Sequence, residues 1–379
     1  MASGNVLQEW FPNTKLPIII SAPMLGSSNG TLAAQVSKAG GFGIVPGGYD
    51  LNADSAQLTS LAKELEAARS ILGLTEMSLT PAPVGVGFLT SHKSVSSFRE
   101  NVLPILEKYM PQAVWLFAPD PDTSPRAQPE VIAVCHEHGF KVFVQVGTVA
   151  AAREAAQDGA DVIVAQGIDA GGHQYASGAG VISLVPEVRL MLEDEFAGKQ
   201  TALVAAGGIA HENAVVGAIA LGADGVVMGT KFLPSKESVW PEAKKKAVLD
   251  TTDGGASTVK SGFHDEIAGT TWLWPKKYDG RAIITESYRD HSAGLPLEEN
   301  QAKFKAAAES DGSRQLIWSG TGIGLVKDAI PAGDIVRNMR EGANKRLQSL
   351  RYAFDDTGKQ AEKDQSWVKQ LGHTMYKHK

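Results

Sequence analysis

Residues 143–167 read FVQVGTVAAAREAAQDGADVIVAQG, and residues 203–229 read LVAAGGIAHENAVVGAIALGADGVVMG. Both stretches contain an apolar run, a glycine turn, an alanine-rich helical segment, Gly-Ala-Asp, and a second apolar run that ends at glycine. Continuous short apolar runs are typical of parallel strands that are buried on both faces. A weaker copy of the pattern, ISAPMLG followed by SKAGGFGIVPGG, lies within residues 20–48. The repeats therefore predict βα units around a parallel sheet.

Working outward from the repeats, eight apolar runs occur before residue 230. They span residues 17–22, 42–45, 84–89, 113–117, 141–146, 161–165, 201–205 and 224–228. Most neighbouring runs are separated by one segment with helical spacing. Eight strands alternating with helices predict an α/β fold, a (β/α)8 TIM-like barrel, with a doubly wound open sheet as the alternative.

The alternation of strands and helices stops after Phe232, where a lysine-rich polar stretch begins. We expect residues 1–235 to form the barrel, which would bind the cofactor. Residues 236–315 are expected to form a smaller, mainly helical domain, inserted after the eighth strand and covering the substrate. Residues 316–379 would return as a helix that packs on the barrel and end in a charged tail.

The composition excludes several classes of protein. Hydrophobic residues make up 43% and charged residues 21% of the 379 residues, as in packed globular proteins. The net charge of −6 argues against nucleic-acid binding, and no apolar run is long enough to span a membrane. The single Cys135 excludes disulfide frameworks and cysteine-rich metal sites. The start of the chain lacks signal-peptide features, so we expect a cytoplasmic protein; its oligomeric state stays open.

Glycine is over-represented, with 40 residues, and some glycines follow predicted strands. Gly207 and Gly208 follow the seventh strand, and Gly229 with Thr230 follows the eighth. In barrels of this type, the loops after these two strands commonly hold a phosphate, helped here by the helix that begins near His211. Tight turns without a ligand are the alternative. No complete dinucleotide fingerprint or P-loop is present, which favours a mononucleotide such as FMN.

His173 is the candidate for proton transfer. It ends the segment QGIDAGGH, residues 166–173, directly after the sixth predicted strand. A histidine with a pKa near ~6.5 can accept or donate a proton at neutral pH. The adjacent Gly171 and Gly172 would let a flat cofactor approach the backbone. A structural loop histidine is the alternative. The sequence CHEH at residues 135–138 is not predicted to bind metal, because positions i and i+2 of a helix face different ways.

Together these motifs resemble those of the nitronate monooxygenases, formerly called 2-nitropropane dioxygenases, and most closely the fungal-type members. The resemblance covers roughly residues 16–232. The matching segments, in order, are Ala22-Pro-Met24, Gln145, Ala170-Gly-Gly-His173, Ile182-Ser-Leu-Val-Pro-Glu187, Ala205-Ala-Gly-Gly-Ile209 and Met228-Gly-Thr230. The segment SGTGIGL at residues 319–325 is similar to the family's closing stretch.

The resemblance implies a TIM-like barrel with non-covalent FMN and a helical domain over the active site. The implied phosphate ligands are Gly207, Gly208, Gly229 and Thr230. The implied contacts to the flavin ring are Ala22, Met24, Gln145 and Gly171, with Gly172 beside them. His173 would be the base that removes the Cα proton of a neutral nitroalkane. A nitronate would pass one electron to FMN, and O2 would complete its oxidation to a carbonyl compound and nitrite.

Two positions depart from the family pattern. Gly87 ends the third strand where related bacterial enzymes often have asparagine, and Gln174-Tyr175 follow the histidine. Both departures are expected to affect substrate preference more than FMN binding.

Three alternatives stay open. An FMN-dependent enoyl-thioester reductase would share the barrel but require NADH, and a non-catalytic flavin-binding barrel would show no turnover. A phosphosugar isomerase or aldolase would be colourless and would carry a lysine or a carboxylate pair at the strand ends, where this chain offers Gln145 and glycines.

Overall fold

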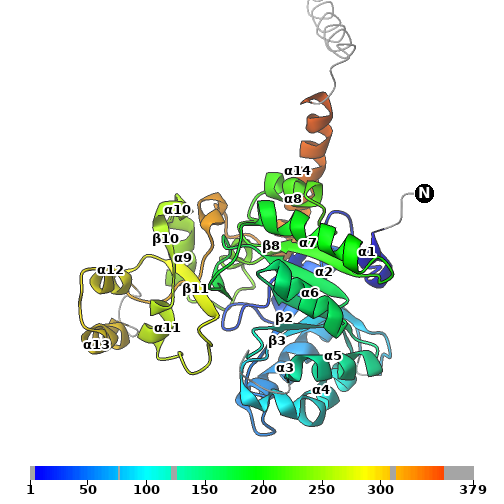
Figure 1. Cartoon of the computed structure of the whole chain (residues 1–379), viewed down its shortest axis with the longest axis horizontal. Coiled ribbons are helices and arrows are strands. Elements are labelled where there is room, and N and C mark those ends of the chain that lie inside the picture. Colours follow the sequence, from blue (N-terminus) through cyan, green and yellow to red (C-terminus); the bar gives the residue numbers. More distant parts are fainter. Residues whose placement is uncertain (1–4, 76, 121–125, 308–312, 354–379) are drawn as a thin grey trace, which may run out of the picture.

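The computed structural model describes residues 5–75, 77–120, 126–307 and 313–353 (Figure 1). Its main body is a sheet of eight parallel strands in the order β1-β9-β8-β6-β5-β4-β3-β2. The strands are β1 Ile18–Ser21, β2 Gly43–Gly48, β3 Ala82–Leu89, β4 Pro111–Phe117, β5 Lys141–Val146, β6 Val162–Gln166, β8 Ala202–Ala206 and β9 Gly225–Met228. Backbone hydrogen bonds of Phe42 with Ile19 and Ser21 join the first and last strands of this order. The predicted TIM-like barrel is therefore confirmed.

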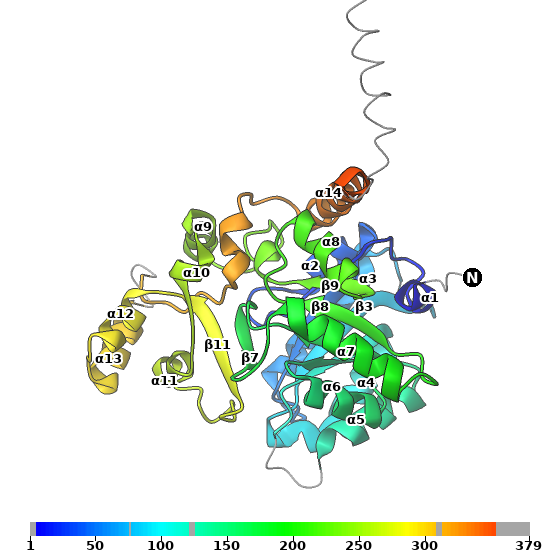
Figure 2. The ribbon, with the colours of Figure 1, turned by 45° about the horizontal axis from the view of Figure 1, so that its top comes forward.

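Helices surround this barrel, as Figures 1 and 2 show. They are α1 Val6–Trp10, α2 Gly30–Lys38, α3 Ala56–Ile71, α4 Leu103–Tyr109, α5 Ala127–Glu137, α6 Val149–Asp158, α7 Val181–Glu195 and α8 Glu212–Ala220. The segment between β3 and β4 is not one continuous helix: a 3-10 turn, Lys93–Ser97, is followed by a π turn, Phe98–Val102, and then by α4. Pro104 lies in the first turn of α4 and has no N–H to continue the preceding hydrogen-bond pattern.

The Gly-Ala-Asp repeat has a structural explanation. Asp161 accepts a hydrogen bond from the N–H of Val142 at 2.8 Å, and Asp224 accepts one from the N–H of Leu203 at 2.8 Å. Each aspartate thus ties the start of its strand to the strand before it. The preceding glycines, Gly159 and Gly222, have φ values of +102° and +105°, a left-handed conformation suited to ending a helix.

Aromatic rings fill the interior of the barrel. Phe42 stacks on Phe143 with centroids 5.9 Å apart, and Phe143 stacks on Trp115 at 5.8 Å. Phe11, just after α1, packs on Phe42 at 4.3 Å. All four residues are buried, so the barrel is a packed core and any ligand space must lie above these rings.

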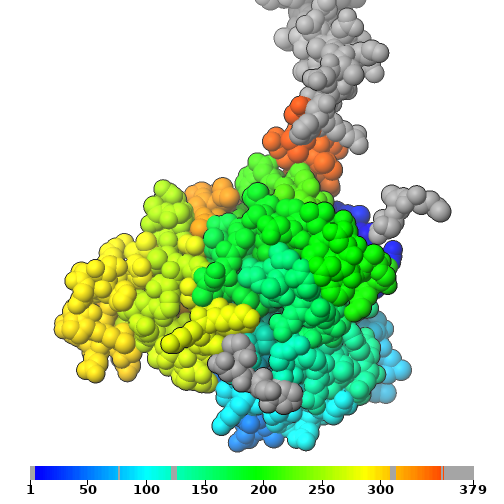
Figure 3. Space-filling view, in the orientation of Figure 1, coloured from blue at the N-terminus to red at the C-terminus, as the bar shows by residue number. Residues whose placement is uncertain are grey.

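A smaller, mainly helical domain follows the eighth strand, as predicted. It contains α9 Glu242–Asp250, α10 Gly254–Ser257, β10 Thr258–Ser261, α11 Phe263–Ala268, β11 Tyr278–Ile283, α12 Glu286–Ser292 and α13 Leu297–Ala307. In the space-filling view this domain, in yellow, lies directly against the green and cyan barrel (Figure 3). The exact boundaries at 235 and 315 stay a prediction.

One strand joins the two parts. The segment after β6 contains β7 Gly172–Tyr175, which pairs antiparallel with β11 and extends a sheet of order β10-β11-β7. Figure 2 shows β7 and β11 side by side. The candidate histidine is therefore on a strand, opposite Gly280.

The chain then returns to the barrel. A 3-10 turn, Thr321–Leu325, precedes α14 Ala332–Ala353, which packs on α2 and α8. Arg340 of α14 donates hydrogen bonds to the carbonyls of Ala39 and Gly40 at 2.9 and 2.8 Å. The far end of α14 extends away from the body (Figure 1). The predicted charged tail, residues 354–379, lies outside the described residues. Within the described part of the chain, the helices are too short or too polar to cross a bilayer.

Candidate active site

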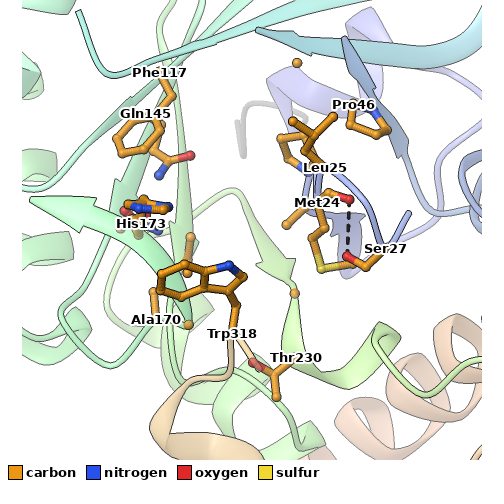
Figure 4. A pocket seen from close by; sticks show the side chains of 18 of the residues that line it. Met24, Leu25, Ser27, Pro46, Phe117, Gln145, Ala170, His173, Thr230 and Trp318 are labelled. Atoms are coloured by element: carbon orange, nitrogen blue, oxygen red, sulfur yellow. Dashed lines mark hydrogen bonds between the residues drawn. The ribbon is translucent and has the colours of Figure 1, made fainter. Parts of the chain in front are cut away.

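A pocket of about 420 Å³ opens at the carboxyl ends of the barrel strands, between the barrel and the second domain (Figure 4). Its size is within the usual range for sites of cofactors and small ligands. All ten residues singled out from the sequence line it: Ala22, Met24, Gln145, Gly171, Gly172, His173, Gly207, Gly208, Gly229 and Thr230. Residues from five separate parts of the sequence therefore meet around one space.

The glycine turn after β8 forms one part of the wall. Gly207 and Gly208 have φ values of +102° and +72°, which L side chains rarely adopt. A Cβ on Gly207 would also lie 2.6 Å from the carbonyl oxygen of Gly167. Tight packing alone thus accounts for Gly207. The turn leads into α8, whose N-terminus provides a favourable field for an anion.

The closing segment at residues 319–325 lies over both glycine loops. A Cβ on Gly171 would lie 2.4 Å from the backbone nitrogen of Gly320, and one on Gly322 would lie 2.8 Å from the carbonyl oxygen of Gly208. The N–H of Gly320 donates to Oγ1 of Thr230 at 3.0 Å. Because this bond uses a lone pair of the hydroxyl, the Thr230 hydrogen is left to donate to a ligand.

Across the pocket, the loop after β1 forms an apolar wall. Figure 4 shows Met24 and Leu25 facing Gln145 and His173. The hydroxyl of Ser28 accepts from the N–H of Met24 at 3.0 Å, which fixes the turn of this loop. The sulfur of Met24 and the aliphatic side chain of Leu25 form a surface that suits a flat, largely apolar ligand.

The departure at Gly87 has a steric cause. Gly87 lines the pocket, and a Cβ at this position would lie 2.6 Å from Cβ of Pro23. This contact is shorter than the structure can tolerate without moving the loop after β1. An asparagine at residue 87 is therefore incompatible with the present position of Pro23.

Two glutamines contribute polar groups to the pocket wall. Oε1 of Gln145 accepts from Nε1 of Trp115 at 3.1 Å, so its amide nitrogen points elsewhere and has no hydrogen-bond partner among the described residues. Gln166 donates to the carbonyl of His173 at 3.2 Å, and its Oε1 is buried without a partner in the described chain. A buried polar atom of this kind is costly unless a ligand or water satisfies it.

His173 is held on three sides. Its ring stacks on Trp274 with centroids 3.5 Å apart and planes 8° apart, and lies 4.7 Å from the Trp318 ring. Its Nε2 lies 2.9 Å from Oδ1 of Asp265, on α11. The same carboxylate oxygen accepts from the hydroxyl of Thr270 at 2.9 Å. The histidine side chain is 14% exposed and the aspartate 5%, so this contact is largely shielded from water.

The two residues after the histidine serve packing. Gln174 is buried and donates to the carbonyl of Ala170 at 2.7 Å, and Tyr175 packs edge-on against Tyr278. Burial raises the pKa of the Tyr175 hydroxyl to about 12. Neither side chain belongs to the pocket wall formed by the described residues. A direct role in substrate preference is thus not supported by their position.

The histidines at residues 136 and 138 separate, as the helical spacing suggests. His136 lies 2.9 Å from Asp161, whereas His138 lies 2.9 Å from Glu107. The described part of the chain holds no cluster of three or more histidine, cysteine, aspartate or glutamate side chains arranged for a metal ion.

The residues that surround His173 are not marked by any sequence pattern. Neither Trp274 nor Asp265 lies in a recognisable sequence motif. Trp318 directly precedes the closing segment at residues 319–325, so its position in the chain was the one weak indication that it lies near the site. The contacts depend on β7 pairing with β11, a non-local pairing between short strands that no local pattern predicts.

A TIM barrel with a ligand pocket at its carboxyl face and a buried histidine–carboxylate pair defines a barrel enzyme. A sequence model described as nitronate monooxygenase matches residues 11–342, so this chain belongs to the nitronate monooxygenase family, whose members are oxidoreductases.

Relatives with related names cover nearly the whole chain. A nitronate monooxygenase of Neurospora crassa is 56% identical and covers 91% of this chain and 93% of its own. Nitronate monooxygenase npaC of Metarhizium robertsii is 35% identical and covers 91% of this chain and 96% of its own.

Among solved structures, FabK of Thermotoga maritima is 22% identical and has a TM-score of 0.68. It covers 92% of this chain and 99% of its own. A nitroalkane oxidase of Streptomyces ansochromogenes is 24% identical with a TM-score of 0.68, covering 91% and 99%. At these identities, the likeness establishes the fold alone.

Proposed function

We propose that this enzyme binds FMN in the 420 Å³ pocket and uses O2 to oxidise alkyl nitronates to carbonyl compounds and nitrite. We further propose that His173 is the catalytic base for neutral nitroalkanes. The observation that carries the proposal is the meeting of all ten motif residues around one pocket. The name of the Neurospora crassa relative supports the choice of nitronates as the substrate class.

The residues of the pocket fit FMN. A Cβ on Gly172 would project into open space, so the backbone here leaves room for a flat group. The partnerless Oε1 of Gln166 and the free amide nitrogen of Gln145 supply an acceptor and a donor for a heterocycle. When bound, FMN would supply the electron transfer between nitronate and O2.

The proposed phosphate site consists of Gly207, Gly208, Gly229 and Thr230. The free hydroxyl hydrogen of Thr230 and the N-terminal field of α8 both favour an anion. Ala22, Met24, Gln145, Gly171 and Gly172 would contact the ring system. This division places the charged end of the ligand at the glycine turns and its flat end near His173.

His173 would act on the substrate through its second ring nitrogen. With Nε2 directed at Asp265, Nδ1 has no hydrogen-bond partner among the described residues and can accept a proton. The nearby apolar side chains limit water around the base. The same imidazole, once protonated, would hold the negative charge of the nitronate that it has formed.

The test is to supply the purified enzyme with an alkyl nitronate and O2, without any nicotinamide. We expect O2 uptake with release of nitrite, and a yellow protein that releases FMN on heating. Turnover only when NADH and an enoyl thioester are present would instead identify a reductase. A colourless protein that cannot be reconstituted with FMN would contradict the cofactor assignment.

A further inference from the structure

The geometry points to Asp265 as a positioning residue that, with Thr270, fixes the proton on Nε2 of His173 and thereby makes Nδ1 the base. This inference rests on the proposed function of His173. It extends the site from the barrel into α11 of the second domain.

The contacts define a directed chain of hydrogen bonds. The Thr270 hydroxyl donates to Oδ1 of Asp265 at 2.9 Å, and Nε2 of His173 lies 2.9 Å from the same oxygen. A carboxylate can only accept, so the nitrogen facing it must carry the hydrogen. The neutral imidazole is therefore the Nε2–H form, and its lone pair is on Nδ1.

Stacking removes the remaining freedom of the ring. Trp274 is parallel to the imidazole at 3.5 Å, and Trp318 closes another side at 4.7 Å. Gly280, paired with His173 across the strands, permits this arrangement, because a Cβ there would lie 2.4 Å from the Trp318 ring. A rotation of the ring that carried Nε2 away from Asp265 would have to displace Trp274 and break the hydrogen bond to the carboxylate.

The carboxylate also matters for the proton transfer itself. When Nδ1 takes the Cα proton of a neutral nitroalkane, the C–H electron pair moves to the nitro group and gives the nitronate. The imidazole becomes a cation, which the shielded Asp265 carboxylate stabilises. A substrate supplied as nitronate has already lost this proton and does not need the step.

Other charged groups around the histidine have partners of their own. His264, beside Asp265 on α11, is buried and bonds to the carbonyl of Val259. On β11, Asp279 pairs with Lys260, and Arg281 donates to the carbonyl of Ile168. Asp265 is thus the acid in contact with the imidazole among the described residues.

The first experiment observes the proton directly. The full-length enzyme, labelled with ¹⁵N-histidine, is examined by NMR, and the His173 signals are assigned by their loss in His173→Asn. We expect the hydrogen on Nε2 in the wild type, in slow exchange with water. Asp265→Ala should speed this exchange more than tenfold. Protonation at Nδ1, or an unchanged signal in Asp265→Ala, would overturn the inference.

The second experiment compares two substrates. Asp265→Asn keeps the shape of the side chain but removes its charge. We expect kcat/KM for a neutral nitroalkane to fall by about 10²-fold or more, and that for the matching nitronate by less than tenfold. An equal fall for both substrates would show that Asp265 is only structural.

The matched control is Asp279→Asn, the same change on β11 of the second domain, where the carboxylate pairs with Lys260; it should leave the ratio of the two activities unchanged. The positioning role of Asp265 and the proposed role of His173 as the base can be disproved independently. If His173 is not the base, His173→Asn leaves nitroalkane turnover intact, yet the NMR experiment still reports whether Asp265 fixes the Nε2 proton.

Discussion

At the scale of single residues, Gly171 shows how closely the pocket wall is packed. Because Gly171 has no side chain, the backbone of Gly320 can pack against it. A Cβ on Gly171 would lie 2.4 Å from the backbone nitrogen of Gly320. We expect Gly171→Ala to destabilise the fold by about 1–3 kcal/mol, because a backbone segment would have to move. The free energy of denaturant unfolding measures this change.

Gly217 provides the matched control. It is inside α8, and a Cβ at this position meets no atom within 4 Å. Gly217→Ala should stabilise the protein by roughly 0.5–1 kcal/mol, because alanine favours the helix. Equal effects of the two substitutions would contradict the close packing of Gly171 against Gly320.

His264 is expected to make the folded protein less stable as the pH falls. Burial lowers the pKa of His264 below its ordinary value, and its Nδ1 has no partner in the described structure to receive a second hydrogen. As the pH falls below about 6.5, the unfolded chain binds this proton first, so the folded state loses stability.

We expect the free energy of unfolding to fall less steeply from about pH 7 to about pH 5 in His264→Gln than in the wild type. The exposed His291, changed in the same way, should leave the slope unaltered. Urea denaturation at a series of pH values makes the comparison. If the free energy of unfolding of His264→Gln changes with pH as steeply as that of the wild type, burial of His264 does not contribute to the pH dependence of stability.

Some of the site residues could be predicted from the sequence and others could not. Gly207, Gly208, Gly229 and Thr230 were identifiable because they follow strands whose order was readable. Asp265 was not, because a lone aspartate on a six-residue helix carries no pattern. Its importance arises only from its 2.9 Å contact with a strand far away in the sequence.

At the scale of elements, the repeated βα units were predictable and β7 was not. The apolar runs identified the barrel strands because both of their faces are buried. Strand β7 has the sequence Gly-His-Gln-Tyr, with two polar side chains, and becomes a strand only by pairing with β11. Tertiary context decides short strands of this kind.

Helix α14 is attached to the barrel by a specific contact. Arg340 donates to the carbonyls of Ala39 and Gly40 at the end of α2, where the helix dipole favours a cation. We expect Arg340→Gln to lower the free energy of unfolding by about 1–3 kcal/mol, because the carbonyl of Ala39 loses its donor and that of Gly40 keeps only the N–H of Lys15.

Arg346 is the control on the same helix. It is exposed, and Ser349 is its side-chain contact in the described structure. Arg346→Gln should change the stability by less than about 0.5 kcal/mol. Similar losses for the two variants would mean that α14 is not attached through Arg340.

At the scale of the whole molecule, the second domain completes the site that the barrel begins. The barrel supplies the glycine turns and the apolar wall, whereas Asp265, Thr270 and Trp274 come from the second domain. Sequence patterns predicted the barrel and a mainly helical second domain. The sheet that joins them could not be predicted, because β7 pairs with a strand, β11, that is far away in the sequence.

The most direct test of the account compares wild type and His173→Asn, both loaded with FMN, on a neutral nitroalkane and on its nitronate. Nitrite release measures turnover. The account predicts that the variant loses about 10²-fold or more of its kcat/KM with the nitroalkane and retains most of its activity with the nitronate. Unchanged turnover of the neutral nitroalkane by His173→Asn would contradict the central claim that this histidine is the base.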